Sequence, residues 1–324
     1  MASIVRFQQI GSPQVLALEE VAESSPGPGE VWLEQSAVGV NYLDITQRNG
    51  AVAVALPSGL GLEAAGRVVA LGAEVETFGV GDRVAYAGGP LGAYASGRIY
   101  PADRLLKLPE EVSEEEAAAV LFKGLTAQYL LKSTYPVGPG TVVLLYGVGG
   151  ALGQLMATWA KHLGAFVIGV VSKQASVEGA EQLGCDAVLV FDREKLAGEV
   201  ARLTQGQKAN VVYDPVGRIS WEASLDSLRP RGLMVSFGAS SGAPSAVELA
   251  TLNAKGSLFL TRPSLAAHTS SLAEYRERAA DVWEAVAIGA IRPNVWGRYR
   301  LSEAALAHQE VESGRSAGSV LLKP

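Results

Sequence analysis

The residues with the clearest chemical signature lie in a glycine-rich segment between Thr141 and Lys173. Val142 to Tyr146 is a short apolar run, typical of a strand that is buried on both faces. Glycines then stand at positions 147, 149, 150 and 153, and apolar residues recur at helical spacing until Gly164. A glycine turn that opens a helix lets backbone N–H groups approach a pyrophosphate at the positive end of that helix. The pattern therefore predicts a dinucleotide site formed by Gly147, Gly150, Ala151, Leu152 and Gly153.

The residues after the next strand indicate which dinucleotide is bound. Phe166 to Val171 reads as that strand, and an NAD site usually has an acidic residue at its end for the ribose hydroxyls. Here Ser172 and Lys173 follow instead, and the first acidic residue is Glu178. A carboxylate would repel a 2′-phosphate, whereas a hydroxyl and an ammonium attract one. The segment favours NADPH, with an exposed and purely solvated Lys173 as the alternative interpretation.

Length, composition and charge set the class of protein. A chain of 324 residues predicts two domains, and 48% hydrophobic with 19% charged residues is typical of a compact protein. The net charge of −6 argues against a sequence-independent grip on nucleic acid. The sequence contains neither an apolar run long enough to span a bilayer nor an apolar signal core at its start. We therefore expect a cytoplasmic protein with no nucleic-acid or membrane partner.

The metal-ligating residues are too few for a metal centre. Cys185 is the sole cysteine, so neither an intrachain disulfide nor a cysteine-rich zinc site can form. The three histidines, at 162, 268 and 308, lack the spacing of a helical zinc motif. We expect no metal site, and we expect Cys185 to pack as a small apolar side chain.

The order of predicted elements indicates an α/β protein with two domains. Short β-rich runs such as Glu30 to Val40 and Gly61 to Gly72, separated by Gly/Pro turns, predict a barrel-like first domain. Ser113 and Glu116 predict a capping box that opens a helix to about Leu121, before a second helical segment at about 125–132. Strands and helices then alternate, which predicts a doubly wound parallel sheet. Predicted strands lie at 187–191, 211–213, 232–237 and 257–261, with helices at 221–228 and 274–288 and a last strand at 318–322.

Several motifs along the whole chain resemble those of one family. They are GVNYLD (39–44), LPSGLGLEAAG (56–66), GDRV (81–84), LGAY (91–94), KGLT (123–126), YDPVG (213–217), RGLMVSFG (231–238) and TRPSL (261–265). Together they resemble the zinc-independent quinone oxidoreductases of the zeta-crystallin type, in the medium-chain dehydrogenase/reductase superfamily. The resemblance implies a GroES-like catalytic domain at 1–125, a Rossmann NADPH-binding domain at 126–262, and a return to the catalytic domain at 263–324.

The resemblance also implies a metal-free reaction. Zinc alcohol dehydrogenases have a catalytic cysteine near Asn41 and a histidine where this chain has Leu62, and their four-cysteine lobe has no counterpart here. Leucine cannot ligate zinc and asparagine is a poor ligand for it. We expect hydride transfer from NADPH to a quinone or conjugated carbonyl, whose developing oxyanion is held by hydrogen-bond donors.

The site residues follow from the matching positions of the family. The resemblance places Asn41, Asp44 and Thr126 near the nicotinamide and substrate, and Asn41 and Thr126 also contact the cofactor. Phe237 and Ser240 would lie along the nicotinamide half, and Arg315 near a family arginine. For Asp44 the alternatives are a helix cap or an ion pair with Arg48. For Asn41 the alternative is a turn-stabilising side chain, and for Arg315 a solvated arginine.

This chain departs from close relatives at four positions. Thr46 and Val52 replace tyrosines, so we expect a wider pocket and a preference other than simple benzoquinone. Ser176 and Phe191 replace a lysine and a tyrosine near the 2′-phosphate, so the preference for NADPH should be weaker than usual.

Other functions remain open from the sequence. An enone or alkenal double-bond reductase would need a proton source, either Tyr42 or solvent. A non-catalytic nucleotide- or RNA-binding crystallin-like protein is the alternative outside enzymes. The segment Lys255 to Leu265 reads as an edge strand, and the family pairs such edges, so we expect a homodimer.

Overall fold

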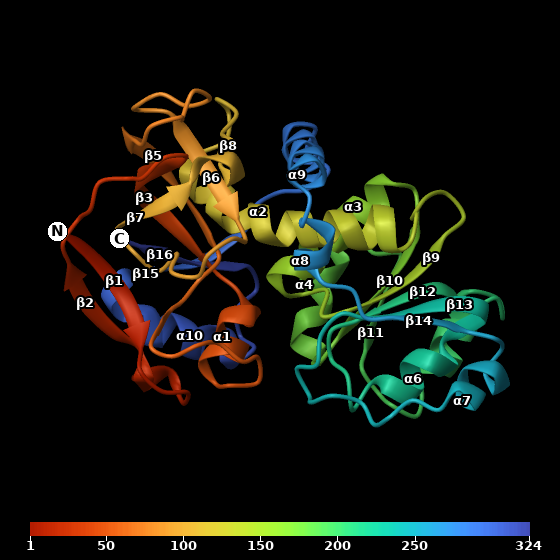
Figure 1. Cartoon of the computed structure of the whole chain (residues 1–324). Helices are drawn as coiled ribbons and strands as arrows, with labels where there is room; N and C mark the ends of the chain where they lie inside the picture. The colour runs from red at the N-terminus through yellow and green to blue at the C-terminus, as the bar shows by residue number, and fades with distance from the viewer. The chain divides into compact units, whose positions relative to one another are not determined.

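The computed structural model describes residues 1–324, and the chain forms two compact units (Figure 1). The first, called here the β-rich unit, contains residues 1–125, 271–287 and 292–324. The second, called the parallel-sheet unit, contains residues 126–270 and 288–291. The predicted combination of a β-rich domain with a doubly wound parallel sheet is confirmed.

The β-rich unit contains a seven-stranded sheet and a three-stranded sheet. In the large sheet the order is β15-β16-β3-β5-β6-β8, with β7 also paired to β3, and in the small sheet it is β2-β1-β4. All pairs are antiparallel except β15 with β16. The strands are β1 (Ala2–Phe7), β2 (Ala17–Val21), β3 (Glu30–Val40), β4 (Ser58–Gly59), β5 (Glu63–Leu71), β6 (Arg83–Ala87), β7 (Gly97–Pro101), β8 (Leu106–Lys107), β15 (Val295–Arg300) and β16 (Ser319–Lys323). The C-terminal strand β16 pairs with β3, which returns the chain to the sheet begun by its N-terminal third.

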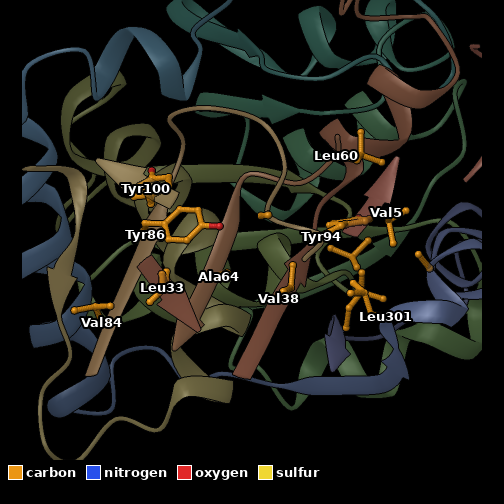
Figure 2. Packing of buried hydrophobic residues seen from close by; sticks show 14 of the residues in the cluster. Val5, Leu33, Val38, Leu60, Ala64, Val84, Tyr86, Tyr94, Tyr100 and Leu301 are labelled. Atoms are coloured by element: carbon orange, nitrogen blue, oxygen red, sulfur yellow. The ribbon is translucent and has the colours of Figure 1, made fainter. Parts of the chain in front are cut away.

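The core of the β-rich unit is built from the inward-facing residues of these strands. Along β3, Val31, Leu33 and Ala37 are fully buried and alternate with more exposed neighbours, as expected for a strand with one face on the core. Figure 2 shows Tyr86 beside Tyr100, and their ring centroids lie 3.9 Å apart. The Tyr86 hydroxyl donates to Gln35 and that of Tyr100 to the Gly88 carbonyl, so both rings are buried without an unpaired hydroxyl.

Four helices belong wholly or largely to the β-rich unit. They are α1 (Tyr42–Arg48), α2 (Glu114–Gln128), α9 (Leu272–Ala287) and α10 (Ala304–Glu312). The predicted capping box is confirmed, since Ser113 Oγ accepts from Glu116 N at 3.2 Å and Glu116 Oε2 accepts from Ser113 N at 2.9 Å.

The predicted break after Leu121 is wrong. The helix α2 runs on to Gln128 and continues as a π-helical segment, Tyr129–Thr134. Gly124 does not end the helix. It is needed instead for packing against a neighbouring helix. A Cβ there would lie 2.7 Å from Val282 Cγ1 on α9, so glycine permits the two helices to approach closely.

The parallel-sheet unit is a single six-stranded sheet with the order β11-β10-β9-β12-β13-β14, in which every pair is parallel. The strands are β9 (Val142–Tyr146), β10 (Phe166–Val171), β11 (Ala187–Val190), β12 (Ala209–Asp214), β13 (Leu228–Ser236) and β14 (Phe259–Thr261). The helices are α3 (Ala151–His162), α4 (Val177–Glu181), α5 (Leu196–Leu203), α6 (Trp221–Asp226), α7 (Leu249–Ala254) and α8 (Leu265–His268). The order reverses between β9 and β12, and ligands of such sheets bind beyond the carboxyl ends of the strands at this point.

Short 3₁₀ turns complete the chain at Pro13–Val15, Ala102–Arg104, Gln174–Ser176 and Leu301–Glu303. None of the helices combines the length and apolar character needed to cross a membrane.

Candidate functional site

The glycine turn of the parallel-sheet unit has the geometry of an anion cradle. Strand β9 ends at Tyr146, Gly147 takes the left-handed conformation with φ +68°, and α3 begins at Ala151. Gly150 N donates to Gly147 O at 2.9 Å, which closes the turn. Gly150 supplies no side-chain cap, so the first N–H groups of α3, at Ala151 and Leu152, are free to face an anion.

The space around the turn fits a dinucleotide phosphate. A Cβ at Gly153 would overlap Gly147 O and lie 2.7 Å from Val148 Cα, so glycine here lets the helix approach the strand. A Cβ at Gly149 would meet no atom within 4 Å, so the turn is open on that side. One glycine is thus required by packing, whereas the surface beside it is left clear for a ligand.

The predicted 2′-phosphate residues lie directly after β10. Ser172 and Lys173 are both exposed, and neither side chain has a hydrogen-bond or ion-pair partner in the protein. Phe191 N donates to Val171 O at 2.8 Å, so the residue after β11 lies beside this strand end. A hydroxyl and an ammonium therefore stand at the edge of the sheet without a competing carboxylate partner.

The loop after β13 is tied to the loop after β12 by main-chain hydrogen bonds. Phe237 N donates to Asp214 O and Ser240 N donates to Pro215 O, each at 3.1 Å. Phe237 is partly buried and Ser240 is exposed. Both residues therefore lie at the carboxyl edge of the sheet, where β9, β12 and β13 end.

Asp214 connects the segments at this edge of the sheet through its hydrogen bonds. This supporting role was not predicted from the sequence. Its side chain is fully buried at the end of β12. Oδ1 accepts from Val216 N at 2.7 Å and Gly217 N at 3.1 Å, and Oδ2 accepts from Ser220 Oγ and Ser224 Oγ, each at 2.7 Å. An aspartate at a strand end, followed by glycine at +3 and serines at +6 and +10, is the signal that the sequence offered.

Asn41 and Asp44 lie together in the β-rich unit at the start of α1. Asp44 Oδ2 accepts from Asn41 N at 2.8 Å and from the Tyr94 hydroxyl at 3.0 Å, while Oδ1 is buried without a partner. Complete burial raises the pKa of Asp44 to about 7, against the lowering effect of the two hydrogen bonds. The alternative of a helix cap is confirmed. The alternative of an ion pair with Arg48 is wrong, because Arg48 pairs with Glu312.

A second group of polar residues surrounds Glu63, the first residue of β5. Its side chain is fully buried, and Oε1 accepts from Phe122 N at 2.6 Å. Oε2 accepts from Asn41 Nδ2 at 3.0 Å and from Lys123 Nζ at 3.4 Å. Asn41 therefore has its main chain held by Asp44 and its side chain held by Glu63, which fixes its orientation.

The Asp44 network continues to the surface through a histidine. His308 Nε2 lies 2.9 Å from the Tyr94 hydroxyl, and Nδ1 lies 3.4 Å from Arg48 Nη1. Tyr94 donates to Asp44, so the fitting tautomer carries its proton on Nε2 and accepts from Arg48 at Nδ1. Burial, and then the Arg48 charge, lower the pKa of His308 to about 3, so the ring is neutral.

The sequence did not identify Glu63, Lys123, Tyr94 or His308 as members of this cluster. Three of the four stand in motifs that carried the family resemblance, but no local spacing connects them. His308 had no signal beyond its residue type.

The two other predicted residues come from helix α2 and from the segment after α10. Thr126 is buried in α2, three residues after Lys123. Arg315 follows α10, has a largely exposed side chain, and pairs with Glu310 at 3.1 Å.

Comparison with known proteins places the chain in a family. Residues 27–110 match the model of the alcohol dehydrogenase GroES-like domain, and residues 151–283 match that of the zinc-binding dehydrogenase. The chain is 42% identical to a quinone oxidoreductase of Pseudomonas aeruginosa and to quinone oxidoreductase 1 of Escherichia coli, in both cases over 100% of both chains. The chain belongs to the quinone oxidoreductases of the medium-chain dehydrogenase/reductase superfamily.

Solved structures of this family confirm the architecture. The Escherichia coli quinone oxidoreductase complexed with NADPH superposes with a TM-score of 0.96 at 41% identity, over 99% of this chain and 100% of that one. The predicted Rossmann and GroES-like combination is therefore confirmed. A 2-haloacrylate reductase of Burkholderia sp is a further relative, 39% identical over 100% of this chain and 99% of its own.

The zinc implied by the name of one matching model does not fit the residues present. Leu62, beside Glu63, offers no donor atom, and the Asn41 amide nitrogen is occupied by Glu63. No three His, Cys, Asp or Glu side chains are grouped so that they could hold a metal ion. We derive no step of the reaction through zinc.

Proposed function

We propose that this quinone oxidoreductase family member transfers a hydride from NADPH to a quinone without a metal ion. The observation that carries this proposal is the full-length 42% identity to curated quinone oxidoreductases, combined with an intact glycine turn in this chain. The matching structure with bound NADPH gives the cofactor.

The parallel-sheet unit would hold the cofactor. The N–H groups of Ala151 and Leu152 and the open face beside Gly149 would face the pyrophosphate. Ser172 and Lys173 would face the 2′-phosphate, and Phe237 and Ser240 the nicotinamide half. Bound NADPH supplies the hydride. The work of these residues is to position it, which is a large part of the rate enhancement in such reactions.

The β-rich unit would supply the substrate contact through Asn41. Asp44 and Glu63 fix the backbone and side chain of this residue, so that its amide group is oriented before a ligand arrives. We assign Asp44 to positioning, since its side chain has no exposed atom. Thr126 and Arg315 are retained as candidate cofactor contacts. The cofactor-binding role is assigned to residues 126–262 and the catalytic role to 1–125 and 263–324.

Two features bear on substrate size and cofactor preference. Thr46 and Val52 stand where close relatives have tyrosines, and Val52 is 41% exposed. The smaller side chains leave room for polycyclic quinones. Phe191 has no donor for a phosphate, and Ser176 offers a short neutral hydroxyl in place of a charged lysine, so Ser172 and Lys173 would have to provide most of the discrimination.

A second candidate function is reduction of a conjugated double bond. The relative named 2-haloacrylate reductase supports it at 39% identity. This reaction would use the same cofactor site and the same Asn41. It differs in requiring a proton at carbon rather than at oxygen.

We also propose a cytoplasmic homodimer that pairs the sheet edge at β14. That edge strand exposes 61% of Phe259, and strand pairing would cover it. Light scattering at micromolar concentration should give the mass of two chains, and cell fractionation should recover the protein in the cytoplasm.

Steady-state oxidation of NADPH and NADH with three acceptors tests the function. We expect turnover of 9,10-phenanthrenequinone to exceed that of 1,4-benzoquinone, with NADPH preferred. Turnover of an enone alone would favour the double-bond reductase. Tight NADPH binding without oxidation by any acceptor would indicate a non-catalytic nucleotide-binding protein, and a mobility shift with RNA at physiological salt would indicate an RNA-binding one.

A further inference from the structure

The cluster around Glu63 contains a buried cation that the proposed function has not used. Lys123 lies in α2 with only 9% of its side chain exposed. Its Nζ is 3.4 Å from Glu63 Oε2, the same oxygen that accepts from Asn41 Nδ2 at 3.0 Å. The ammonium of Lys123 and the amide of Asn41 are therefore neighbours across one carboxylate oxygen.

The ammonium group of Lys123 has N–H donors that are not used within the protein. It carries three N–H bonds, and Glu63 at 3.4 Å is its one hydrogen-bond partner in the protein. Burying an ammonium is costly unless it is paired, and here the single pairing contact is long. At least two N–H bonds are thus available to an acceptor that the protein itself does not provide.

The other charged groups of the cluster are committed elsewhere. Arg48 is bound to Glu312, His308 and the Gly11 carbonyl. Glu63 already accepts three hydrogen bonds. Lys123 is thus the cation beside Asn41 that is able to bind a further group.

The chemistry of quinone reduction leaves a place for such a group. Adding a hydride to a quinone places negative charge on an oxygen, which must be stabilised and then protonated. The residues present do not fit a zinc ion that could stabilise this charge. Tyr42, an alternative proton source, is 47% exposed and has no hydrogen bond that would orient its hydroxyl.

We propose that Lys123 is the electrophile and proton donor of this enzyme, with Glu63 positioning its ammonium beside Asn41. The inference rests on the proposed function and names the group that completes it. The reduced cofactor supplies the hydride. The Nζ–H bond then breaks as an O–H bond forms on the reduced quinone, which leaves a neutral amine, and a proton from water restores the ammonium.

The first test is the kinetics of the variant Lys123→Met. We expect kcat with a quinone to fall by about 10²-fold, the usual contribution of a positioned acid, while the affinity for NADPH stays within about twofold. Lys323→Met is the matched control, since it removes a Lys–Glu pair of the same unit, with Nζ 3.0 Å from Glu115, and should leave kcat unchanged.

A double variant separates this role from a structural one. Lys123→Met alone leaves Glu63 as an unpaired buried charge, whereas Glu63→Gln with Lys123→Met removes both charges. We expect the double variant to regain thermal stability but not activity. Recovery of activity together with stability would overturn the proposal.

Chemical rescue distinguishes a role of the ammonium charge from a role of the side chain in packing. In a Cys185→Ser background, Lys123→Cys treated with 2-bromoethylamine regains an ammonium on a side chain of nearly the original length. We expect this treatment to raise kcat at least tenfold above that of the untreated Lys123→Cys variant. Failure to restore any activity in a folded, fully alkylated protein would contradict the proposal.

A binding measurement that needs no turnover keeps the inference separate from the proposed function. The probe is 4-nitrophenol, whose spectrum distinguishes phenol from phenolate, added to the protein with and without oxidised NADP. The wild-type protein should bind the phenolate more tightly than Lys123→Met by at least tenfold. Equal affinities would overturn the role of Lys123, whereas failure of the wild type to reduce any quinone would overturn the proposed function instead.

Discussion

Each unit contains a completely buried aspartate, and the two side chains differ in the number of hydrogen bonds that they accept. Asp214 of the parallel-sheet unit accepts four hydrogen bonds, two at each oxygen. Asp44 of the β-rich unit accepts two hydrogen bonds, both at Oδ2, and its Oδ1 has no partner. Burial raises the pKa of Asp44, whose carboxyl group is left partly unsatisfied, to about 7. The two buried carboxylates therefore differ in how fully they are hydrogen-bonded: Asp214 anchors the end of its strand, whereas Asp44 keeps one unpaired oxygen.

The candidate sites of the two units differ in the same sense. The glycine turn acts through main-chain N–H groups and the absence of side chains, so it should be sensitive to added volume. The Asn41 cluster acts through charged side chains around Glu63, so it should be sensitive to changes of charge. Substitutions that add volume at the turn and substitutions that remove charge from the cluster should therefore have different effects.

Added volume at the turn should abolish cofactor binding. In Gly153→Ala the new Cβ would overlap the Gly147 carbonyl oxygen, so the turn or the helix must shift. We expect NADPH affinity, measured by isothermal titration, to fall by more than about 10²-fold, which corresponds to about 2.7 kcal/mol. Gly198→Ala, in helix α5 of the same unit, is the matched control because its Cβ meets no atom within 4 Å, and equal losses in both variants would contradict the steric account.

Changes of charge in the Asn41 network should alter how stability depends on pH. Folding raises the pKa of Asp44 from 3.8 to about 7, so the native state binds more protons over that range and stability falls as pH rises. Folding lowers the pKa of His308 from 6.5 to about 3, so the unfolded state binds more protons and stability rises with pH. The two slopes oppose each other between about pH 4 and 6.5.

Single variants should expose each slope. Asp44→Asn should leave a free energy of unfolding that rises from pH 4 to pH 6.5, and His308→Gln one that falls over the same range. Each change should amount to a few kcal/mol by urea denaturation at a series of pH values. Parallel profiles for the two variants and the wild type would show that neither group titrates as described.

The exposed cofactor contact should give a smaller effect. Lys173→Ala removes one exposed ammonium, so we expect the ratio of kcat/KM for NADPH over NADH to fall about tenfold, or about 1.4 kcal/mol. Steady-state kinetics with both cofactors measures this ratio. Lys195→Ala, which removes a lysine that is 77% exposed in the same unit, should leave it unchanged.

Much of the fold could be predicted because its signals are local. The boundaries of β3, β9 and β10 follow from period-two alternation or from short buried runs, and the turn after β9 from its glycines. The helix Tyr42–Arg48 was indicated only by the two alternatives for Asp44, a cap and an ion pair with Arg48. It begins within a motif that carries the family resemblance, and its capping box joins Asn41 and Asp44.

The charge cluster could not be predicted because its members meet only through tertiary structure. Pairing of β3 with β5 places Glu63 near Asn41, and Lys123 joins them from α2. His308 comes from α10 and lies 214 residues after Tyr94 in the sequence. Contacts between such distant residues leave no pattern in the sequence. The glycine turn, in contrast, is formed by residues that lie within about a dozen positions of one another.

Whether hydride transfer needs a metal ion can be decided by measuring zinc content and turnover in one preparation. The purified protein would be dialysed against EDTA, its zinc measured, and its oxidation of NADPH by 9,10-phenanthrenequinone recorded before and after zinc is added back. We expect full turnover at substoichiometric zinc and no gain when zinc is added. Turnover that rises in proportion to bound zinc would contradict metal-free hydride transfer, and with it the role assigned to Lys123.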